Sequence, residues 1–371
     1  MKRKDDQERT RDSAIDSRLN QNLPSIFISR RDFFKFFGLL GVIVGAGIDP
    51  VMLRKPAEAA MPSDQVIFRM TWFPLGKESP FWITKEKGFW SKNGIDVVLR
   101  GGIGSSSNAQ LLGAGQDDFA MLDASILIAS RLAGIPVKML GLHLAKLPII
   151  LISKKGKNIL EPKDLMGKKV ITGPGNEQFL FEAFLKLHRI DLSKVQHIVG
   201  GRDHALMMLQ DQADAATEVA PTILPTFKSL GFEEGKNLNI MRFSKFGFPK
   251  LLGFGVCTKE STITKKKDLV KRFVPPVYEG IRYAMEHPDE TAEIFVKYYP
   301  EMDKQIVLEG LKISFESFDT TEAREHTLGW MSKEQWNWTQ DLLFSIGQIK
   351  GKIPVEDCFT NEFLSGPPYK P

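Results

Sequence analysis

Short apolar runs alternate with amphipathic segments along most of this chain. The runs are rich in Val, Ile, Leu and Phe and end at Gly- or Asp-containing turns, which is typical of buried strands. Strands are predicted at residues 66–70, 95–99, 119–122, 137–142, 149–153, 169–172, 213–217 and 253–258. Helices are predicted at residues 80–90, 109–113, 126–133, 179–188 and 204–209, with a mainly helical segment from 265 onward. Strands that alternate with helices indicate parallel βαβ units, so the expected fold class is α/β.

Residues 1–60 follow a different pattern, that of an export signal. Arg30 and Arg31 precede an uncharged run of 13 residues, 36–48, and the small residues of 57–60 follow. A charged segment, a short apolar run and an A-x-A site are typical of a cleaved signal, and paired arginines indicate the twin-arginine route. The alternative is an uncleaved membrane anchor, but a spanning helix needs about 20 apolar residues. The sequence therefore predicts export to the periplasm through the Tat translocase.

The charge of the remaining chain is close to balance. The full sequence has 50 Lys+Arg and 45 Asp+Glu, and residues 1–60 contain 11 and 8 of these. The 311 residues from 61 onward therefore carry 39 basic and 37 acidic side chains, a net charge of +2. Such a balance gives no reason to expect nucleic acid as a partner.

The chain has two cysteines, Cys257 and Cys358, and no recognisable cofactor motif. The two could form a disulfide in an oxidising compartment, but neither has a Cys-x-x-Cys or Cys/His metal-ligand spacing. There is also no G-x-S-x-G, H-E-x-x-H or Walker-type loop. We therefore predict no catalytic residues, no metal and no cofactor.

The order of several segments resembles a known family. The segments are 81–90 with 93–97, 112–121, 133–137, 165–170, 200–206 and the C-terminal 336–342 and 357–364. The first is similar to an "A-x-x-x-G-x-F" helix followed by a "G-[IL]-D-V" strand, and 112–121 to "L-x-x-G-x-x-D-F-G". Together they resemble the periplasmic solute-binding proteins for nitrate, alkanesulfonates and thiamine-type pyrimidine precursors (NMT1/THI5-like and SsuA-like). The resemblance spans nearly the whole chain after residue 60.

This resemblance implies a type II periplasmic-binding-protein fold, with two α/β lobes joined by two crossover hinge strands. The expected domains are 61–150 for the first part of lobe 1, 151–250 for lobe 2, and 251–371 for the return to lobe 1 and the C-terminal helices. The strand-like segments 149–153 and 252–258 flank one block, as a crossing and a return require. The resemblance also implies a monomer that binds a small molecule and delivers it to an ABC permease in the inner membrane.

Ligands of open α/β sheets bind outside the carboxyl ends of the strands, and this rule selects candidate residues. Trp72 and Phe73 follow the first strand and could stack on a planar ligand, whereas the nearby Phe81 and Trp82 could equally be core. Ser105 and Ser106 lie in a loop before a helix and could bind an oxyanion or simply cap the helix.

The remaining candidates follow the later strands. Asp123 and Ser125 come after an apolar strand, where Asp123 could accept hydrogen bonds from an amine or ring N–H, or could be an N-cap. Asn176 lies in the corresponding loop of the second lobe, and His143 follows the strand 137–142. Glu218 stands where the family often has tryptophan-glutamate-proline, but here Thr217 replaces the aromatic residue.

The predicted function is the substrate-binding component of an ABC importer for a sulfonate, nitrate or pyrimidine-type ligand. Two alternatives share the fold: a ligand-sensing subunit for a membrane receptor, and an exported enzyme. The aromatic residues favour a planar ligand, and the serine-rich loop favours an anion. Asp123, if it faces the cleft, disfavours an anion and points to a neutral or amine-bearing heterocycle.

Overall fold

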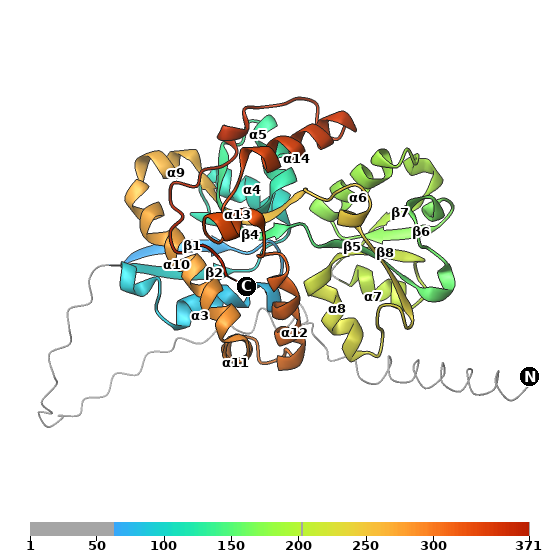
Figure 1. Cartoon of the computed structure of the whole chain (residues 1–371), viewed down its shortest axis with the longest axis horizontal. Helices are drawn as coiled ribbons and strands as arrows, with labels where there is room; N and C mark the ends of the chain where they lie inside the picture. The colour runs from blue at the N-terminus through green and yellow to red at the C-terminus, as the bar shows by residue number, and fades with distance from the viewer. Residues whose placement is uncertain (1–62, 202, 371) are drawn as a thin grey trace, which may run out of the picture. The chain divides into compact units, whose positions relative to one another are not determined.

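The protein is described by a computed structural model that covers residues 63–201 and 203–370, so the predicted export signal lies outside the described residues. The described strands form two five-stranded sheets (Figure 1). The first has the order β2-β1-β3-β10-β4 and the second β7-β6-β8-β5-β9. We call each sheet, together with the helices packed on it, the first and the second lobe. The predicted α/β class is confirmed.

In each sheet four strands run in one direction and one strand, β10 or β5, runs in the opposite direction. The first contains β1 (Asp64–Arg69), β2 (Ile95–Arg100), β3 (Phe119–Asp123), β4 (Val137–Lys146) and β10 (Leu252–Lys259). The second contains β5 (Ile149–Lys154), β6 (Lys169–Thr172), β7 (Gln196–Val199), β8 (Ala215–Val219) and β9 (Leu238–Arg242). β1 is parallel to β2 and β3, and β6 is parallel to β7 and β8, whereas β10 and β5 run antiparallel to both of their neighbours.

The two strands that run antiparallel to their neighbours, β5 and β10, come directly after the two segments in which the chain crosses from one sheet to the other. The chain leaves β4 and enters β5 after only two residues, 147 and 148, and it returns from β9 to β10 through residues 243–251. In register, Phe254 of β10 lies opposite Asp123 of β3 and Leu144 of β4, while Ile150 of β5 lies opposite Glu218 of β8. The passages therefore place the ends of β3 and β8 close to the junction of the lobes.

Helices cover both faces of each sheet (Figure 1). The first lobe contains α3 (Ser79–Glu86), α4 (Ser105–Ala114), α5 (Ala124–Leu132), α9 (Glu260–Lys265), α10 (Lys267–Glu286), α11 (Pro288–Tyr298), α12 (Lys304–Phe315), α13 (Thr321–Glu325) and α14 (Lys333–Ser345). The second contains α6 (Asn176–Leu187), α7 (His204–Leu209) and α8 (Ala220–Ser229). Within the described ranges, no helix combines the length and the apolar character that a bilayer span requires.

Aromatic rings dominate the core of the first lobe. Phe273 of α10 stacks on Phe119 with ring centroids 3.7 Å apart, and its other neighbour Trp90 lies at 5.5 Å. The indole Nε1–H of Trp90 donates to the Phe273 carbonyl, which satisfies its buried polar atom. Phe81 and Trp82 are 0% and 3% exposed, so both belong to this core, as the alternative explanation predicted.

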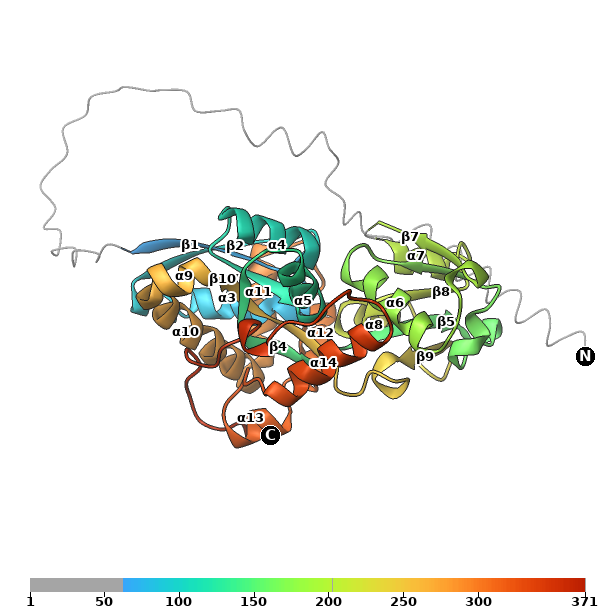
Figure 2. The ribbon, with the colours of Figure 1, turned by 90° about the horizontal axis from the view of Figure 1, so that it is seen from above.

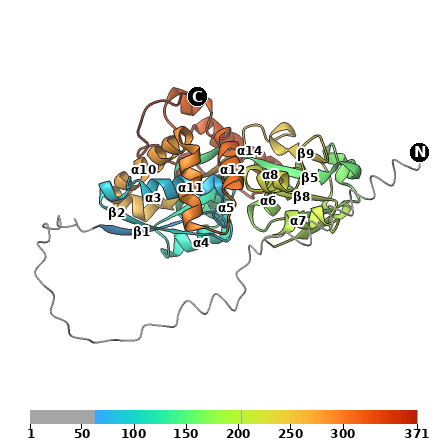
Figure 3. The same cartoon turned by 90° about the horizontal axis from the view of Figure 1, so that it is seen from below.

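Helix α12 lies beside α8 of the second lobe, as the views from above and below show (Figures 2 and 3). The 3-10 turn Gly76–Glu78 packs on the same helix, since a Cβ at Gly76 would lie 2.3 Å from the Val307 carbonyl oxygen. A Cβ at Gly310 would lie 2.7 Å from the Pro221 carbonyl oxygen. Gly76 thus permits close packing on α12 within the first lobe, and Gly310 permits the close approach of α12 to α8 of the second lobe.

Several predicted elements differ from the structure in their bounds, and two strands are missing from the prediction. β4 continues to Lys146 rather than ending at 142, because it pairs with β10 along its whole length. The strands β7 and β9 are absent from the prediction because both are largely polar or half-exposed edge strands without a continuous apolar run. Helix α4 begins at Ser105 rather than at residue 109.

Candidate functional site

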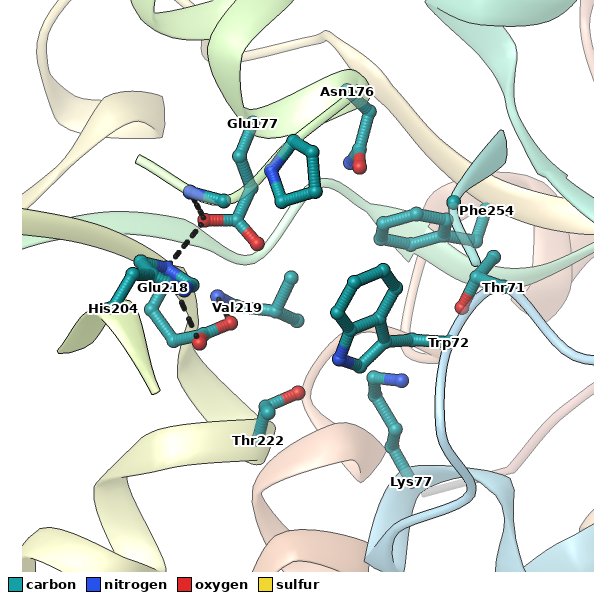
Figure 4. A pocket seen from close by; sticks show the side chains of 13 residues that line it. Thr71, Trp72, Lys77, Asn176, Glu177, His204, Glu218, Val219, Thr222 and Phe254 are labelled. Carbon is teal, nitrogen blue, oxygen red and sulfur yellow. Dashed lines mark hydrogen bonds and ion pairs between the residues drawn. The ribbon is translucent and has the colours of Figure 1, made fainter. Parts of the chain in front are cut away.

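A pocket at the junction of the lobes collects side chains from the carboxyl ends of several strands. The cavity volume is about 40 Å³. The first lobe contributes Thr71, Trp72, Lys77, Gly104 and Phe254, and the second contributes Gly173, Pro174, Asn176, Glu177, His204, Glu218, Val219 and Thr222. Figure 4 shows the rings of Trp72 and Phe254 on one side and Glu177, His204 and Glu218 on the other. One wall is therefore aromatic and the other polar.

Backbone contacts hold Trp72 at the aromatic wall. The loop after β1 receives hydrogen bonds from the loop after β2: Gly102 N–H donates to the Trp72 carbonyl and Gly104 N–H to the Thr71 carbonyl. Arg69 connects the same elements, because its Nη1 donates to the Gly101 carbonyl while Nε forms a 2.6 Å ion pair with Asp117. These contacts fix the indole at the pocket edge, where Trp72 is only partly buried.

A Cβ at Gly102 would lie 2.0 Å from the Met70 carbonyl oxygen, so only glycine allows the two loops to approach this closely. The position of Trp72 therefore depends on a glycine that does not itself contact the pocket.

Three side chains from separate segments form the polar wall. Glu177 lies in the first turn of α6, His204 is the first residue of α7, and Glu218 is near the end of β8. His204 Nε2 lies 3.2 Å from Glu177 Oε2 and 3.6 Å from Glu218 Oε2. The exposed fractions of the three side chains are 12% or less. We call these three residues the Glu–His–Glu cluster.

Neighbouring groups orient every member of this cluster. Glu177 Oε2 accepts hydrogen bonds from Gly173 N–H and Thr217 Oγ1, and Glu218 Oε1 accepts one from Val219 N–H. His204 Nδ1 lies 3.0 Å from the Gly201 carbonyl oxygen, and Nε2 lies 2.8 Å from the Thr217 carbonyl oxygen. Each ring nitrogen of this imidazole thus faces a backbone carbonyl, which can only accept a hydrogen bond.

The environment of the Glu–His–Glu cluster shifts the pKa values of Glu218 and His204. Burial raises the pKa of Glu218 to about 8, and the nearby charge of Glu177 raises it further. Burial acts against protonation of His204, but its hydrogen bond to Glu177 and the charges of Glu177 and Glu218 outweigh burial and raise its pKa to about 10. At neutral pH the imidazole is therefore a cation that sits between the two glutamates.

Lys77 brings a cationic side chain to the first-lobe side of the pocket. Its ammonium is paired with the neighbouring Glu78, and both residues are at most 3% exposed. Its carbonyl lies 2.8 Å from Nε2 of His143, which is buried within β4 against the rings of Phe81 and Phe318. Burial lowers the pKa of His143 to about 3, so this imidazole is neutral and Nε2–H donates to the carbonyl.

The pocket brings together three of the side chains selected from sequence: Trp72, Asn176 and Glu218. Asn176 is 8% exposed, and its Nδ2 has no hydrogen-bond partner among the described residues. Figure 4 shows Asn176 among the side chains that line the pocket. That these three bind a ligand stays a prediction.

The other selected residues lie outside the pocket lining. His143 is behind Lys77, and Phe73 is partly buried beside Trp72. Ser105 is buried in the first turn of α4, where its Oγ accepts a hydrogen bond from Asp123 N–H, and Ser106 is exposed. The expected serine loop is thus helical, and only the preceding Gly104 reaches the pocket.

Asp123 is a helix N-cap in the structure. Its Oδ1 accepts hydrogen bonds from Ser125 N–H and Ile126 N–H at the start of α5, and the residue is 0% exposed. Burial raises its pKa from 3.8 to about 7, against the effect of the two backbone hydrogen bonds. The N-cap accounts for Asp123 Oδ1 and the Ser125 N–H, whereas Asp123 Oδ2 and Ser125 Oγ are buried without a hydrogen-bond partner among the described residues. That Asp123 and Ser125 bind a ligand stays a prediction.

Several lining residues were not selected from sequence, among them Lys77, His204 and Phe254, whereas Glu177 lies in the same loop as the selected Asn176. His204 carried a signal, because it opens a helix after the Gly200-Gly201 turn, as Asn176 does after Gly173-Pro174-Gly175. Phe254 lies in the strand predicted to cross between the lobes, where ligands of such a fold bind. Lys77 carried no signal that separates it from a surface lysine.

The two cysteines are free and buried in the structure. Burial raises the pKa of the Cys358 thiol to about 12 and that of Cys257 well above its ordinary value. Neither sulfur contributes to the pocket lining.

Comparison with known proteins identifies the family. The model of the NMT1/THI5-like family matches residues 77–291, which is more than half of the chain. The chain belongs to the NMT1/THI5-like family. The resemblance inferred from sequence is therefore confirmed, and the matched range includes most of the pocket.

Two curated relatives and one solved structure illustrate the range of this family and fold. The riboflavin-binding protein RibY of Chloroflexus aurantiacus is 23% identical over 85% of this chain and 90% of its own length. A 4-amino-5-hydroxymethyl-2-methylpyrimidine phosphate synthase of Legionella pneumophila is 20% identical over 82% of this chain and 94% of its own. The periplasmic aliphatic sulphonate binding protein SsuA of Escherichia coli superimposes with a TM-score of 0.61, at 11% identity, over 79% of this chain and 96% of its own.

The structural likeness confirms the predicted periplasmic-binding-protein fold of two α/β lobes. The relatives include both a binding protein and a synthase, so membership of the family does not by itself decide between ligand binding and catalysis.

Proposed function

We propose that this protein is the substrate-binding component of an ABC importer, and that its ligand is a planar heterocycle bearing N–H groups. The observation that carries the proposal is the division of the pocket into an aromatic and an acidic wall. Trp72 and Phe254 offer ring faces for stacking, while Glu177 and Glu218 offer carboxyl oxygens to N–H donors at the edge of the same ring.

The acidic wall disfavours the anionic ligands that the sequence left open. Two glutamates and one imidazolium, that of His204, face the ligand, and the ammonium of Lys77 is already paired with Glu78, so this pocket has no excess of positive charge for a nitrate or sulfonate. A buried anion without an opposite charge binds weakly. The riboflavin-binding relative, which covers most of this chain, supports a heterocyclic ligand.

Because some relatives are synthases, catalysis on a pyrimidine is the second candidate function. We favour ligand binding over catalysis because the similar solved structures include binding proteins, and because the pocket offers two aromatic surfaces for stacking. A sensor subunit that presents the same bound ligand to a membrane receptor would use the same pocket.

Isothermal titration of the purified chain tests the proposal. The panel contains riboflavin, 4-amino-5-hydroxymethyl-2-methylpyrimidine, an alkanesulfonate and nitrate, with each ligand recovered afterwards and analysed by chromatography. We expect one of the heterocycles to bind and to be recovered unchanged, and we expect no binding of the two anions. Tight binding of an anion alone would reject the heterocycle, and recovery of a converted heterocycle would establish the enzyme instead.

We also propose that the chain is exported to the periplasm by the Tat translocase and acts there as a monomer. Replacing both Arg30→Lys and Arg31→Lys should abolish export, because the twin-arginine route requires the paired arginines. Cell fractionation and the length of the processed protein measure the effect. Normal processing of the doubly substituted chain would exclude this route, and an Arg3→Lys, Arg11→Lys chain is the matched control.

A further inference from the structure

The Glu–His–Glu cluster has a geometry that the proposed capture of a heterocycle does not explain. With Nδ1–H of His204 donating to the Gly201 carbonyl, Nε2 points at three oxygens, those of Thr217, Glu177 and Glu218. Since the Thr217 carbonyl, 2.8 Å away, can only accept a hydrogen bond, Nε2 must carry a proton or bind a cation. A histidine that donates one ring N–H to a backbone carbonyl has the usual arrangement of a metal ligand.

The carboxylates are preorganised for the same cation. Glu218 Oε1 is held by Val219 N–H, which turns Oε2 toward His204. Glu177 is held by Gly173 N–H and by the hydroxyl of Thr217. Such outer hydrogen bonds fix the orientation of metal ligands and are a regular feature of metal sites.

Two of the three separations between the ligand atoms match a small divalent ion with nitrogen and oxygen ligands. One ligand atom from each of Glu177, His204 and Glu218 lies within 4.8 Å of the others. The separations of 3.2 and 3.6 Å from Nε2 are close to the edge of about 3.3 Å of a tetrahedron with bonds of about 2.05 Å, as for Zn²⁺. One divalent ion also balances two carboxylates, which removes the cost of burying them together.

We propose that Glu177, His204 and Glu218 bind a divalent transition-metal ion of the Zn²⁺ type in the wall of the pocket. The three protein ligands leave one coordination position open, and because all three residues line the pocket, that position faces the bound molecule. The ion would offer a Lewis-acidic contact to a ring nitrogen or carbonyl of the ligand. Lys77, the cation on the opposite side, is neutralised by Glu78 and does not compete for the carboxylates.

Titration of Zn²⁺ alone into the chelator-treated and dialysed chain tests this site. We expect binding of one ion per chain, and a loss of affinity of at least about tenfold in both His204→Ala, which removes a ligand atom, and Glu218→Gln, which replaces a carboxylate by a weaker neutral amide. Replacement by Co²⁺ should give the visible absorption of a four-coordinate site in the wild-type chain and not in the variants.

Matched controls come from the same lobe. His188 also contacts a backbone carbonyl, that of Phe246, and Glu182 lies on the same helix as Glu177, but neither belongs to the cluster. His188→Ala and Glu182→Gln should bind Zn²⁺ as the wild type does. Circular dichroism of each variant verifies its fold, and two independent ligand substitutions keep the test decisive if one fails to fold.

Absence of Zn²⁺ binding by the wild type would overturn the proposal and leave His204 as an imidazolium between two glutamates. Equal binding by His204→Ala and Glu218→Gln would also overturn it, because the ion would then be elsewhere. The Zn²⁺ titration is carried out without any heterocycle, and the heterocycle titration is repeated in the presence of a chelator, so each kind of binding is measured separately. Failure of the metal site is therefore distinguishable from failure of the proposed function.

Discussion

Replacing Trp72 by alanine should weaken binding of the heterocyclic ligand by about ten- to a hundredfold. Stacking of an aromatic side chain on a planar base contributes about 1–3 kcal/mol, which corresponds to this range of affinities. The indole lies at the pocket and is only partly buried, so its removal should leave the melting temperature of the unliganded protein nearly unchanged. Isothermal titration measures the affinity, and calorimetry without ligand measures the stability.

Trp338 provides the matched control for this substitution. It is also a partly buried tryptophan, but it lies on α14 and is outside the pocket lining. Trp338→Ala should bind the ligand as the wild type does, and Trp72→Phe should retain most of the affinity because it keeps a ring face. Unchanged affinity in Trp72→Ala, or an equal loss in Trp338→Ala, would remove Trp72 from the site.

Replacing Asp123 by asparagine should make the protein more stable at pH 8, by up to about 4 kcal/mol, and leave its stability nearly unchanged at pH 4. Asparagine can still accept the hydrogen bonds from Ser125 and Ile126, so the N-cap is preserved. The gain arises because burial raises the pKa of Asp123 from 3.8 to about 7. A tenfold change in the proton affinity of this carboxyl on folding corresponds to about 1.4 kcal/mol of free energy of unfolding.

The sign of the pH dependence follows from proton binding. Between pH 4 and pH 7 the folded protein keeps the Asp123 proton, whereas the unfolded chain has lost it. The stability of the wild type therefore falls as pH rises through this window and levels off above the folded pKa. Asparagine does not titrate, so this contribution to the slope should be absent from the variant. Denaturant unfolding at several pH values measures the difference between the two chains.

Asp191 is the control for the second prediction. It caps the 3-10 turn Leu192–Lys194 through Ser193 N–H, but it is exposed, and this hydrogen bond lowers its pKa. Asp191→Asn should therefore give no gain at pH 8. A difference between Asp123→Asn and the wild type that does not vary with pH would show that Asp123 stays ionised in the folded protein.

The site itself was only partly predictable from sequence. The rule that ligands bind at the carboxyl ends of strands selected Trp72, Asn176 and Glu218, because it depends only on the order of elements along the chain. The same rule also selected Asp123 and Ser105, whose side chains are used within the first lobe as an N-cap and as an acceptor for a backbone N–H. Local sequence cannot distinguish a helix N-terminus that binds a ligand from one whose polar groups are already hydrogen-bonded to neighbouring residues.

The sequence by itself determined the α/β class, the family and the order of the elements, because apolar periodicity and short ordered motifs are local properties of the chain. Only the tertiary structure decided which polar residues meet. Glu177, His204 and Glu218 lie on three separate elements, and no spacing rule connects them. They come together because the parallel pairing of β6 with β8 aligns the ends of these strands, with the starts of α6 and α7 beside them.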